Sequence, residues 1–456
     1  MVTTYFEDLF NDKKFLRKTI TIGIPIAMQG LLNTTLNLVD TMMIGSQGES
    51  AIAAVGLANK VFFVFTLLLF GVVSGSSILT AQYWGKKDIK NIRRVLGVSL
   101  IIGVSASIIF VLSGLFFPKI VMRIFTPSEN TISIGASYLI IVALSYPLTA
   151  ITNCYIALLR ATNKVKAPVF ITIVSIGVNV VLNYTFIFGH FGAPALGVRG
   201  AAIATVIARL VECIAILSVV YISKGAAAAK IKEMINFDKE FLKKYFITVS
   251  PVIANEFTWG LGVTMYSLVY GRMGDDAVAS ITITQNVEQI CVVLFQGLSA
   301  ATAVILGNEL GANKLTKAEG YSKKFFTLQL MLSVIMGGVC ALIRIPLINL
   351  FSVSDYIARD ITRCLNIFII YLPFRTFNLV NIVGVLRSGG DTKASLLLDM
   401  TGVWCVGIPL AFLGGIVFKL PIYYVYAMLT FEEVYKFILG FKRYKQKKWL
   451  RNIVGV

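Results

Sequence analysis

Four polar residues within long apolar stretches have the types and spacing needed to hold a small cation: Asp40, Asn179, Asn183 and Thr205. Asn179 and Asn183 are four apart, so they share one face of a helix. Asp40 lies about five residues, roughly 8 Å, from one end of its stretch, and the other three fall at a comparable depth. One carboxylate, two amide carbonyls and one hydroxyl would suit a hard cation, or would surround a proton on Asp40. Alternatively, the four residues only join helices by hydrogen bonds.

The composition indicates that the stretches holding these residues cross a membrane. Hydrophobic residues make up 57% of the 456 and charged residues 14%, whereas a soluble domain has about 25% charged residues. A helical span needs about 20 apolar residues. Twelve stretches qualify, near 18–45, 51–84, 95–117, 131–159, 167–190, 196–222, 242–271, 277–309, 323–349, 356–386, 394–415 and 417–440.

An internal repeat divides these spans into two sets of six. Six residues recur 226 positions later (251 − 25): Pro25, Gly45, Gly48, Ala51, Gly71 and Gly85 return as Pro251, Gly271, Gly274, Ala277, Gly297 and Gly311. Arg160 returns as Arg387, within similar flanking sequence. We therefore predict an all-α polytopic membrane protein of two homologous six-helix lobes, residues 1–225 and 226–456, joined by a Gly-Ala linker at 225–229. With six crossings each, both lobes enter the bilayer in the same sense, as a parallel repeat.

The distribution of lysine and arginine among the loops predicts the orientation of the protein in the membrane. Alternate loops are rich in them, as in 86–94, 160–166, 224–244 and 314–324, while the loops between these have few. The positive-inside rule then places both termini in the cytoplasm of a cell membrane. The net charge of +19 is accounted for by these loops, which argues against nucleic-acid binding. The basic tail up to Arg451, with Trp449, either binds anionic lipid or only helps to fix the topology.

Other ionisable residues in the spans are candidates for function, because a charge at the bilayer centre costs about 2.5–3.5 kcal/mol on insertion scales. Lys60 lies at about the depth of Asp40 and either pairs with it or extends outward. Glu256 and Glu288 would meet a cationic substrate or form an ion pair with Arg375. Arg209 and Glu212 are three apart and are expected to neutralise each other, whereas the role of Asp399 is open.

Enzyme chemistry and ATP hydrolysis are not indicated. His190 is the only histidine, and the six cysteines lack the paired spacing of zinc or redox sites. No glycine loop followed by Lys-Ser or Lys-Thr is present to cradle a nucleotide phosphate. We therefore expect no cofactor and an ion gradient as the energy source.

Several motifs, in order and across both halves, resemble the multidrug and toxic compound extrusion (MATE) family. They are Asp40-Thr41-Met42-Met43-Ile44-Gly45, Ala81-Gln82-Tyr83-Trp84-Gly85, Val198-Arg199-Gly200-Ala201-Ala202-Ile203-Ala204-Thr205, and Leu386-Arg387-Ser388-Gly389. The resemblance implies two lobes around a central cleft, and export of organic cations in exchange for Na⁺ or H⁺ by alternating access. The family's amino-terminal cation site then corresponds to Asp40, Asn179 and Thr205, with Asn183 where many members have Asp. The carboxy-lobe site of NorM-type members does not transfer to Glu256, which comes about a turn too early.

Three classes of function remain in competition. The first is a cation-coupled exporter, a monomer among membrane lipids, with Lys60, Glu256, Glu288 and Arg375 as candidate cleft residues and Trp259, Met265 and Tyr266 beside Glu256 as an apolar wall for the substrate. The second is a flippase for a lipid-linked precursor, which would need unpaired basic residues to hold pyrophosphate. A channel or receptor is the third, and mid-membrane carboxylates within a repeat argue against it.

Overall fold

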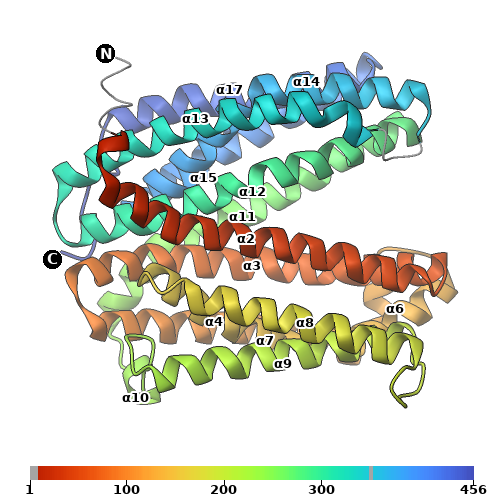
Figure 1. Ribbon diagram of the computed structural model, residues 1–456, viewed down its shortest axis with the longest axis horizontal. Helices are drawn as coiled ribbons and strands as arrows, with labels where there is room; N and C mark the ends of the chain where they lie inside the picture. Colours follow the sequence, from red (N-terminus) through yellow and green to blue (C-terminus); the bar gives the residue numbers. More distant parts are fainter. Residues whose placement is uncertain (1–8, 349–352, 456) are drawn as a thin grey trace. The chain divides into compact units, whose positions relative to one another are not determined.

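The protein is described by a computed structural model that covers residues 9–348 and 353–455. Residues 1–8, 349–352 and 456 lie outside this description, including the last position of the predicted span 323–349. Within the described residues all regular structure is helical and there is no strand (Figure 1). The predicted all-α class is therefore correct.

Each predicted span coincides with one helix or with consecutive helices. The bounds are α2 (Lys13–Gly45), α3 (Glu49–Lys86), α4 (Ile89–Phe116), α5 (Pro118–Arg123), α6 (Glu129–Val142), α7 (Ser145–Ala161), α8 (Lys166–Phe188), α9 (Val198–Ile222), α10 (Ile231–Met234), α11 (Lys239–Met273), α12 (Asp275–Gly311), α13 (Leu315–Ile348), α14 (Asp355–Asn378), η1 (Leu379–Leu386), α15 (Thr392–Met400), η2 (Thr401–Gly407), α16 (Ile408–Phe412), η3 (Leu413–Val417) and α17 (Ile422–Lys445), where η marks π-helical segments. The largest boundary differences are at α13, which begins at Leu315 rather than 323, and at α4, which begins at Ile89 rather than 95.

Length and hydropathy alone identify fewer membrane spans than the sequence predicts. In the described part of the chain, nine helices are long and apolar enough to cross a membrane, and α6 with α7, bent by 49°, makes a tenth. The remaining predicted spans are α11 and α17, which carry ionisable residues such as Glu256, Glu432 and Lys436. Their lower hydropathy thus reflects ionisable side chains that are buried in the structure.

The helices form two compact units. Unit 1 contains the described residues of Met1–Ala27, Ala81–Lys87 and Ser250–Val456, and unit 2 contains Met28–Thr80 and Asp88–Val249. Unit 2 therefore includes the predicted linker at 225–229 and the short helix α10. The predicted boundary after residue 225 separates two homologous halves of the sequence, which need not be the same as two compact units. That boundary stays a prediction.

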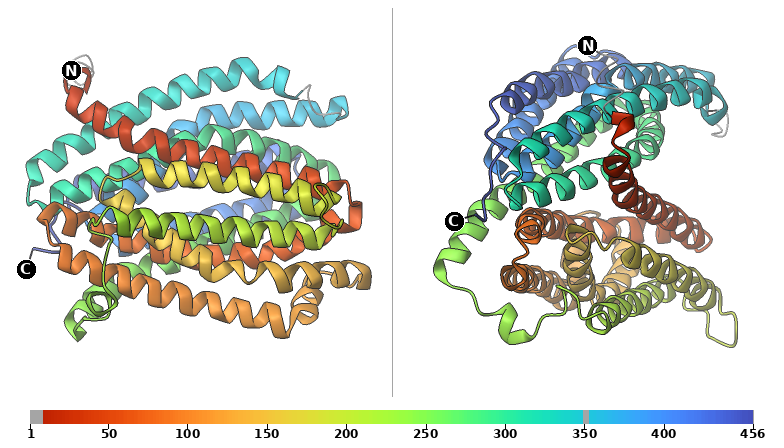
Figure 2. Two further views of the ribbon diagram at one scale, coloured as in Figure 1. Left: turned by 60° about the horizontal axis from the view of Figure 1, so that its bottom comes forward. Right: turned by 60° about the vertical axis from the view of Figure 1, so that its left-hand side comes forward.

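Unit 2 is built around a core of α3, α6, α7 and α9 residues, among them Phe65, Tyr146 and Ala202. Figure 2 shows α8 and α9 running side by side along this unit, in agreement with their extensive packing. The loop helix α10 packs on α4, where Arg93 forms an ion pair with Glu233 at 2.5 Å. The backbone N–H of Lys230 donates to Glu233 and, together with Arg93, lowers the pKa of this exposed loop carboxylate.

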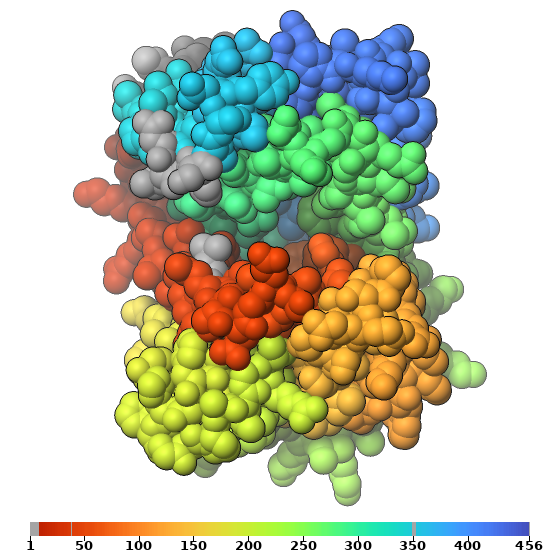
Figure 3. Space-filling model, turned by 90° about the vertical axis from the view of Figure 1, so that its right-hand side faces the viewer, coloured from red at the N-terminus to blue at the C-terminus, as the bar shows by residue number. Residues whose placement is uncertain are grey.

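The loops of unit 2 separate by charge between its two ends. Figure 3 looks onto the end that carries the turn from α2 to α3 (red), the α5 and α6 segment (orange) and the turn from α8 to α9 (yellow-green). Because consecutive spans run in opposite directions, the basic loops at 88–94, 160–166 and 223–238 belong to the other end (Figure 1). This separation is the pattern on which the predicted cytoplasmic side depends.

Unit 1 is built around α12, most of whose side chains are buried. Helices α13, α14 and η1 pack against it, and α17 packs on α14. Its core includes Phe368, Leu372 and Val425. The three π-helical segments η1, η2 and η3 all lie in this unit, and such segments are frequent at functional sites.

Two repeat-related glycines bring helix backbones of unit 1 into contact. A Cβ at Gly85 would lie 2.0 Å from the carbonyl oxygen of Asn308, and a Cβ at Gly311 would lie 1.9 Å from that of Gln82. Gln82 and Asn308 are also 226 apart (308 − 82), so the crossing of α3 and α12 is itself symmetric. Small residues at membrane helix crossings allow this close approach.

The carboxyl-terminal segment packs against the same crossing. Trp449 is fully buried, the N–H of Ile453 donates to Gln82 at 2.8 Å, and Lys86 donates to the carbonyl of Val454 at 2.9 Å. In this structure Trp449 is therefore part of the interior of unit 1 and does not face lipid. The neighbouring lysines of the tail, such as Lys448, stay exposed.

Replacing Gly311 by alanine should destabilise the protein, because the new Cβ overlaps a carbonyl oxygen of the facing helix. Overpacking of this kind typically costs about 1–3 kcal/mol. We expect a lower apparent Tm in detergent for Gly311→Ala, measured by a thiol-independent fluorescence assay. Gly320→Ala is the control, since a Cβ there meets nothing within 4 Å; an equal Tm for the two variants would contradict the close crossing.

Candidate cation site and buried ion pairs

Three of the four predicted cation-site residues meet in unit 2. The side-chain N–H of Asn183 donates to Asp40 at 2.7 Å and to Asn179 Oδ1 at 3.1 Å. Asn179 and Asn183 share one face of α8, as their spacing predicts, and are 4% and 1% exposed. Asp40 reaches them from α2 and is half-buried.

Thr205 belongs to the same region but bonds within its own helix. Its hydroxyl donates to the carbonyl of Ala201 at 2.9 Å. Tyr138 of α6 lies within hydrogen-bonding reach of Thr205 and interacts electrostatically with Asp40. Tyr138 is not predicted from the sequence, since one tyrosine in an apolar span carries no positional signal. The hydrogen-bonded site is thus Asp40, Asn179 and Asn183, with Thr205 and Tyr138 as neighbours.

The orientation of Asn183 leaves one acceptor available. Both groups that its Nδ2 contacts are oxygen acceptors, so the amide nitrogen must face them. The buried Oδ1 of Asn183 then has no hydrogen-bond partner in the described structure. An unpaired buried acceptor costs about 1–3 kcal/mol. A cation or a proton donor beside Asp40 would satisfy it, so the donor set suits Na⁺ or H⁺.

Lys60, the predicted partner of Asp40, does not pair with it, whereas Arg209 lies near enough to interact with it. Lys60 is exposed and forms no ion pair with Asp40 among the described residues. Arg209 interacts electrostatically with Asp40 and forms the expected ion pair with Glu212 at 2.8 Å. Because Glu212 neutralises Arg209, Asp40 stays the carboxylate without a direct ion-pair partner in this site.

A hydrogen-bonded chain joins the spans of unit 2 next to the site. Gln29 donates to Thr172 at 2.7 Å, and Thr172 donates to Glu212 at 3.1 Å. Arg160 donates to Oε1 of Gln29. The chain connects α2, α7, α8 and α9, and every member is polar and enclosed by apolar helices.

Unit 1 contains repeat-related hydrogen bonds. Asn255, the repeat partner of Gln29, donates to Asp399 at 3.0 Å. Asp399 follows Thr172 by 227 positions (399 − 172), the offset that relates Arg387 to Arg160. Arg387 forms an ion pair with Glu256 at 3.0 Å and is 1% exposed. Asp399, whose role the sequence leaves open, therefore accepts a hydrogen bond from Asn255 in the structure.

The predicted cleft residues of unit 1 are engaged in ion pairs. Arg375 pairs with Glu288 at 2.5 Å and donates to Tyr371 at 3.0 Å, and Tyr426 also donates to Glu288. The ion-pair alternative is thus realised for Glu288, whereas Glu256 pairs with Arg387 rather than Arg375. In this conformation neither carboxylate is free to bind a substrate.

The three residues predicted to form an apolar surface for the substrate differ in their exposure. Trp259 is 44% exposed and Met265 is half-buried. Tyr266 is buried and donates to Glu432 at 2.6 Å. The structure therefore does not bring these three side chains together on one surface.

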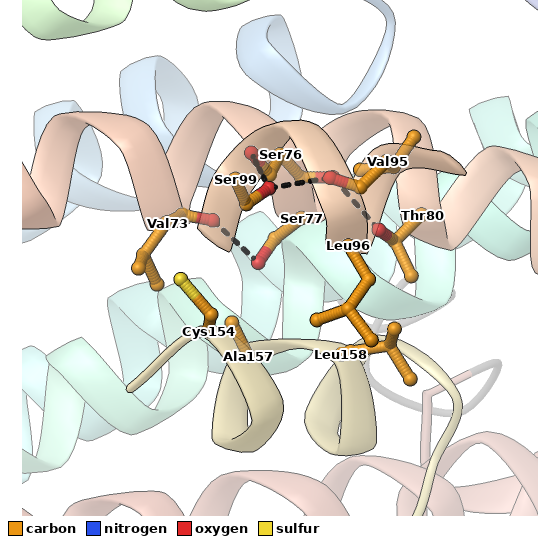
Figure 4. Close-up of a pocket in the computed structure, with 10 residues that line it drawn as sticks. All are labelled: Val73, Ser76, Ser77, Thr80, Val95, Leu96, Ser99, Cys154, Ala157 and Leu158. Atoms are coloured by element: carbon orange, nitrogen blue, oxygen red, sulfur yellow. Dashed lines mark hydrogen bonds between the residues drawn. The ribbon is translucent and has the colours of Figure 1, made fainter. Parts of the chain in front are cut away.

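One small pocket within unit 2 is lined by hydroxyls (Figure 4). Ser99 donates to Ser76, and Ser76 also contacts the hydroxyl of Tyr245 at 2.7 Å. The space inside, about 10 Å³, is about that of a single water. The pocket is therefore far too small for an organic substrate.

Comparison with known proteins identifies the family. The MatE family model matches residues 25–185 and again residues 251–413. The chain belongs to the MatE family. The two matches begin 226 positions apart (251 − 25), which is the offset of the internal repeat, so the homology of the halves is confirmed independently. Because the family consists of transporters, this protein is a membrane transporter rather than an enzyme, as the sequence predicts.

Relatives match the chain over nearly its full length. The uncharacterized transporter YisQ of Bacillus subtilis is 25% identical over 443 residues, covering 97% of this chain and 96% of the relative. The probable multidrug resistance protein NorM of Thermotoga maritima is 26% identical over 448 residues, covering 96% and 94%. A crystal structure of MATE in complex with MaL6 has a TM-score of 0.86 at 19% identity, covering 94% of this chain and 96% of that chain. The predicted two-lobed helical fold is thus confirmed.

Removing Arg375 alone should be far more damaging than removing it together with Glu288. Breaking a buried ion pair leaves an uncompensated charge and typically costs about 3–5 kcal/mol, whereas an apolar replacement of both partners is often close to neutral. We expect a large loss of apparent Tm for Arg375→Met and recovery in Arg375→Met with Glu288→Met. Additive losses in this double-mutant cycle would show that the pair does not stabilise unit 1.

Proposed function

We propose that this transporter exports organic cations and that Na⁺ or H⁺ entry drives the export through the Asp40 site. The observation that carries the proposal is the cluster of Asp40, Asn179 and Asn183, with a buried and unpartnered acceptor on Asn183. A relative named as a probable multidrug resistance protein supports the substrate class.

A carboxylate is the group that allows such coupling. A bound cation neutralises Asp40 and satisfies the Asn183 carbonyl, so the loaded and empty sites differ in charge within a medium of low dielectric constant. A ligand shifts a conformational equilibrium only through its different affinity for the two states. Asp40 supplies that difference if the site is accessible from one side of the membrane at a time.

The lipid-precursor flippase is not favoured by the charges of the described spans. Arg209, Arg375 and Arg387 each have a carboxylate partner within 3.0 Å, so none of them is available to hold a pyrophosphate. We further propose that the protein functions as a monomer with both termini in the cytoplasm, without a cofactor. The segregation of basic loops supports this orientation.

Asp40→Asn should abolish gradient-driven export, because the amide cannot carry the charge that the coupling ion neutralises. The measurement is efflux of a fluorescent organic cation from proteoliposomes, with a Na⁺ gradient and a pH gradient imposed separately. Asp360→Asn is the matched control, a buried carboxylate of α14 that pairs with Arg363. Full activity of Asp40→Asn would move the coupling site elsewhere, and no export by the wild type under either gradient would reject the exporter.

Asn183→Asp should make the protein dependent on a bound cation. The new carboxylate would face Asp40 at the position from which Asn183 now donates at 2.7 Å, so the two charges would repel unless Na⁺ or a proton lies between them. We expect Na⁺ to raise the apparent Tm of the variant, with an affinity gain of about tenfold or more over the wild type, which is ~1.4 kcal/mol. Choline at equal ionic strength is the control, and an equal response to both salts would count against a cation site here.

A further inference from the structure

The last described residues of the chain contain no helix and pack across one end of unit 1. This segment, residues 447–455, follows α17 and is called the C-terminal strap below. It contacts the end of α3, the end of α12 and the turn between η1 and α15. The proposed function does not use it, and the sequence predicts only a basic tail at this position.

Gln82 of α3 is the central contact of the strap. Its Oε1 accepts from the backbone N–H of Ile453 at 2.8 Å, and its Nε2 donates to the carbonyls of Ser388 at 2.7 Å and Arg451 at 3.3 Å. Gln82 is fully buried. Without the strap its Oε1 would lose this donor, and an unpaired buried acceptor is unfavourable. One side chain thus joins the first half of the sequence, the turn after η1 and the strap.

The strap also donates to carbonyl groups of the second half. Arg451 donates to the carbonyls of Gly389 at 3.0 Å and Gly390 at 2.8 Å. Asn452 donates to the carbonyl of Gly311 at 3.3 Å. Gly311 is the last residue of α12, and the two other glycines lie just beyond η1, where helices leave carbonyls unpaired. The strap therefore supplies donors that these helix ends need.

Gly389 provides the space in which the strap lies. A Cβ at Gly389 would lie 1.5 Å from the carbonyl oxygen of Trp449. The φ angle of Gly389 is not in the left-handed region, so its backbone conformation does not require glycine. In the other copy of the repeat the same position is Thr162 (389 − 162 = 227), with a φ of −95°. The turn can thus be built with a side chain, and its absence at Gly389 serves the contact with the strap.

Two features of the docked strap are unfavourable. The indole N–H of Trp449 is buried and has no acceptor in the described structure. Lys447 has a φ of 55°, in the left-handed region that is costly for a residue with a Cβ. Both costs are relieved when the strap leaves, which favours a reversible contact over a permanent one.

The end of α3 connects the strap to conformational change. Residues Ala81–Lys87 belong to unit 1, whereas the rest of α3 belongs to unit 2. The strap bonds to this end at Gln82 and at Lys86, whose ammonium donates to the carbonyl of Val454 at 2.9 Å. Departure of the α3 end from its crossing with α12 would break both contacts. Docking of the strap and formation of the crossing therefore stabilise each other, and such coupling is reciprocal.

We propose that unit 1 has a docking surface for the chain's own C-terminal strap, and that the docked strap is a latch that holds the end of α3 on α12 and on the turn after η1. The docking surface consists of Gln82, Lys86, Gly311, Gly389 and Gly390. The latch is closed in this structure and opens when the strap leaves. Its role in a conformational cycle rests on the proposed transport function, whereas the docking itself does not.

Hydrogen–deuterium exchange of the purified full-length protein in detergent, read by mass spectrometry, tests the docking. We expect slow exchange of strap peptides that contain Ile453 in the wild type, and exchange about tenfold faster or more in Gly389→Ala and Gln82→Ala. Gly320→Ala is the control, since a Cβ there meets nothing within 4 Å. Fast exchange in the wild type, or unchanged exchange in both variants, would overturn the docking surface.

Distances between spin labels test the latch. Lys87→Cys and Lys393→Cys place labels on exposed positions at the end of α3 and the start of α15, and Cys405→Ala removes the exposed native thiol. We expect one narrow distance distribution for the full chain, and an additional longer distance when the chain ends at Lys448 or carries Gly389→Ala. An unchanged distribution in a variant whose strap exchanges fast would show that the strap is no latch.

A synthetic peptide with the sequence of residues 446–456 separates docking from folding. Added to the truncated protein, it should restore the narrow distribution, while the same peptide with Trp449→Ala should not. Failure of the peptide to bind a truncated protein that is folded by circular dichroism would contradict the proposal. Because none of these measurements uses transport, rejection of the exporter would leave their outcomes unchanged.

Discussion

The cost of enclosing a charge among apolar helices is the constraint on which the rest of this structure depends. Each buried cation described in the spans is found with an acceptor: Arg209 with Glu212, Arg375 with Glu288, Arg387 with Glu256, and Lys436 with two glutamates. Two of these contacts, Arg375 with Glu288 and Arg387 with Glu256, join helices that are distant in sequence. The other two lie within a single helix, α9 or α17. The charged residues also lower the hydropathy of α11 and α17, the two helices that carry several of the charges. Asp40 differs from these groups, because its side chain accepts a hydrogen bond from Asn183 and has no direct ion-pair partner among the described residues.

The repeat preserves hydrogen-bonded positions rather than residue types. Gln29 and Thr172 in unit 2 correspond to Asn255 and Asp399 in unit 1, and both pairs are bonded. The last helix of each half begins after residues 224 apart (421 − 197), Gly197 and Pro421. With this offset Arg209 and Glu212 correspond to Glu433 and Lys436 (433 − 209, 436 − 212), and each pair is an ion pair of spacing three. The charges are exchanged between the copies, so the geometry persists while the electrostatics of the two units diverge.

This divergence gives the two units different chemistry. Unit 2 offers one carboxylate among neutral oxygens from Asn179, Asn183 and Thr205, which is a ligand set for a small cation. Unit 1 offers several carboxylates around one ammonium, with π-helical turns and glycines at the contact. The carboxylates of the two units therefore have unequal partners.

The sequence by itself determined the membrane class, the helical spans, the two homologous halves and the shared face of Asn179 and Asn183, because hydropathy, repeat offset and helical spacing are local properties. It also placed Asp40 at the same depth as the asparagines. Tertiary structure alone decided the partners. Glu256 forms its ion pair with Arg387 rather than with Arg375, and Lys60 is exposed. Tyr138 lies beside the Asp40 site. Each of these outcomes depends on the direction in which a side chain leaves its helix. The spacing of Glu432, Glu433 and Lys436 along one helix is visible in the sequence. The hydrogen bond from Tyr266 to Glu432 is not, because pairing across helices, unlike periodicity, leaves no pattern in a single sequence.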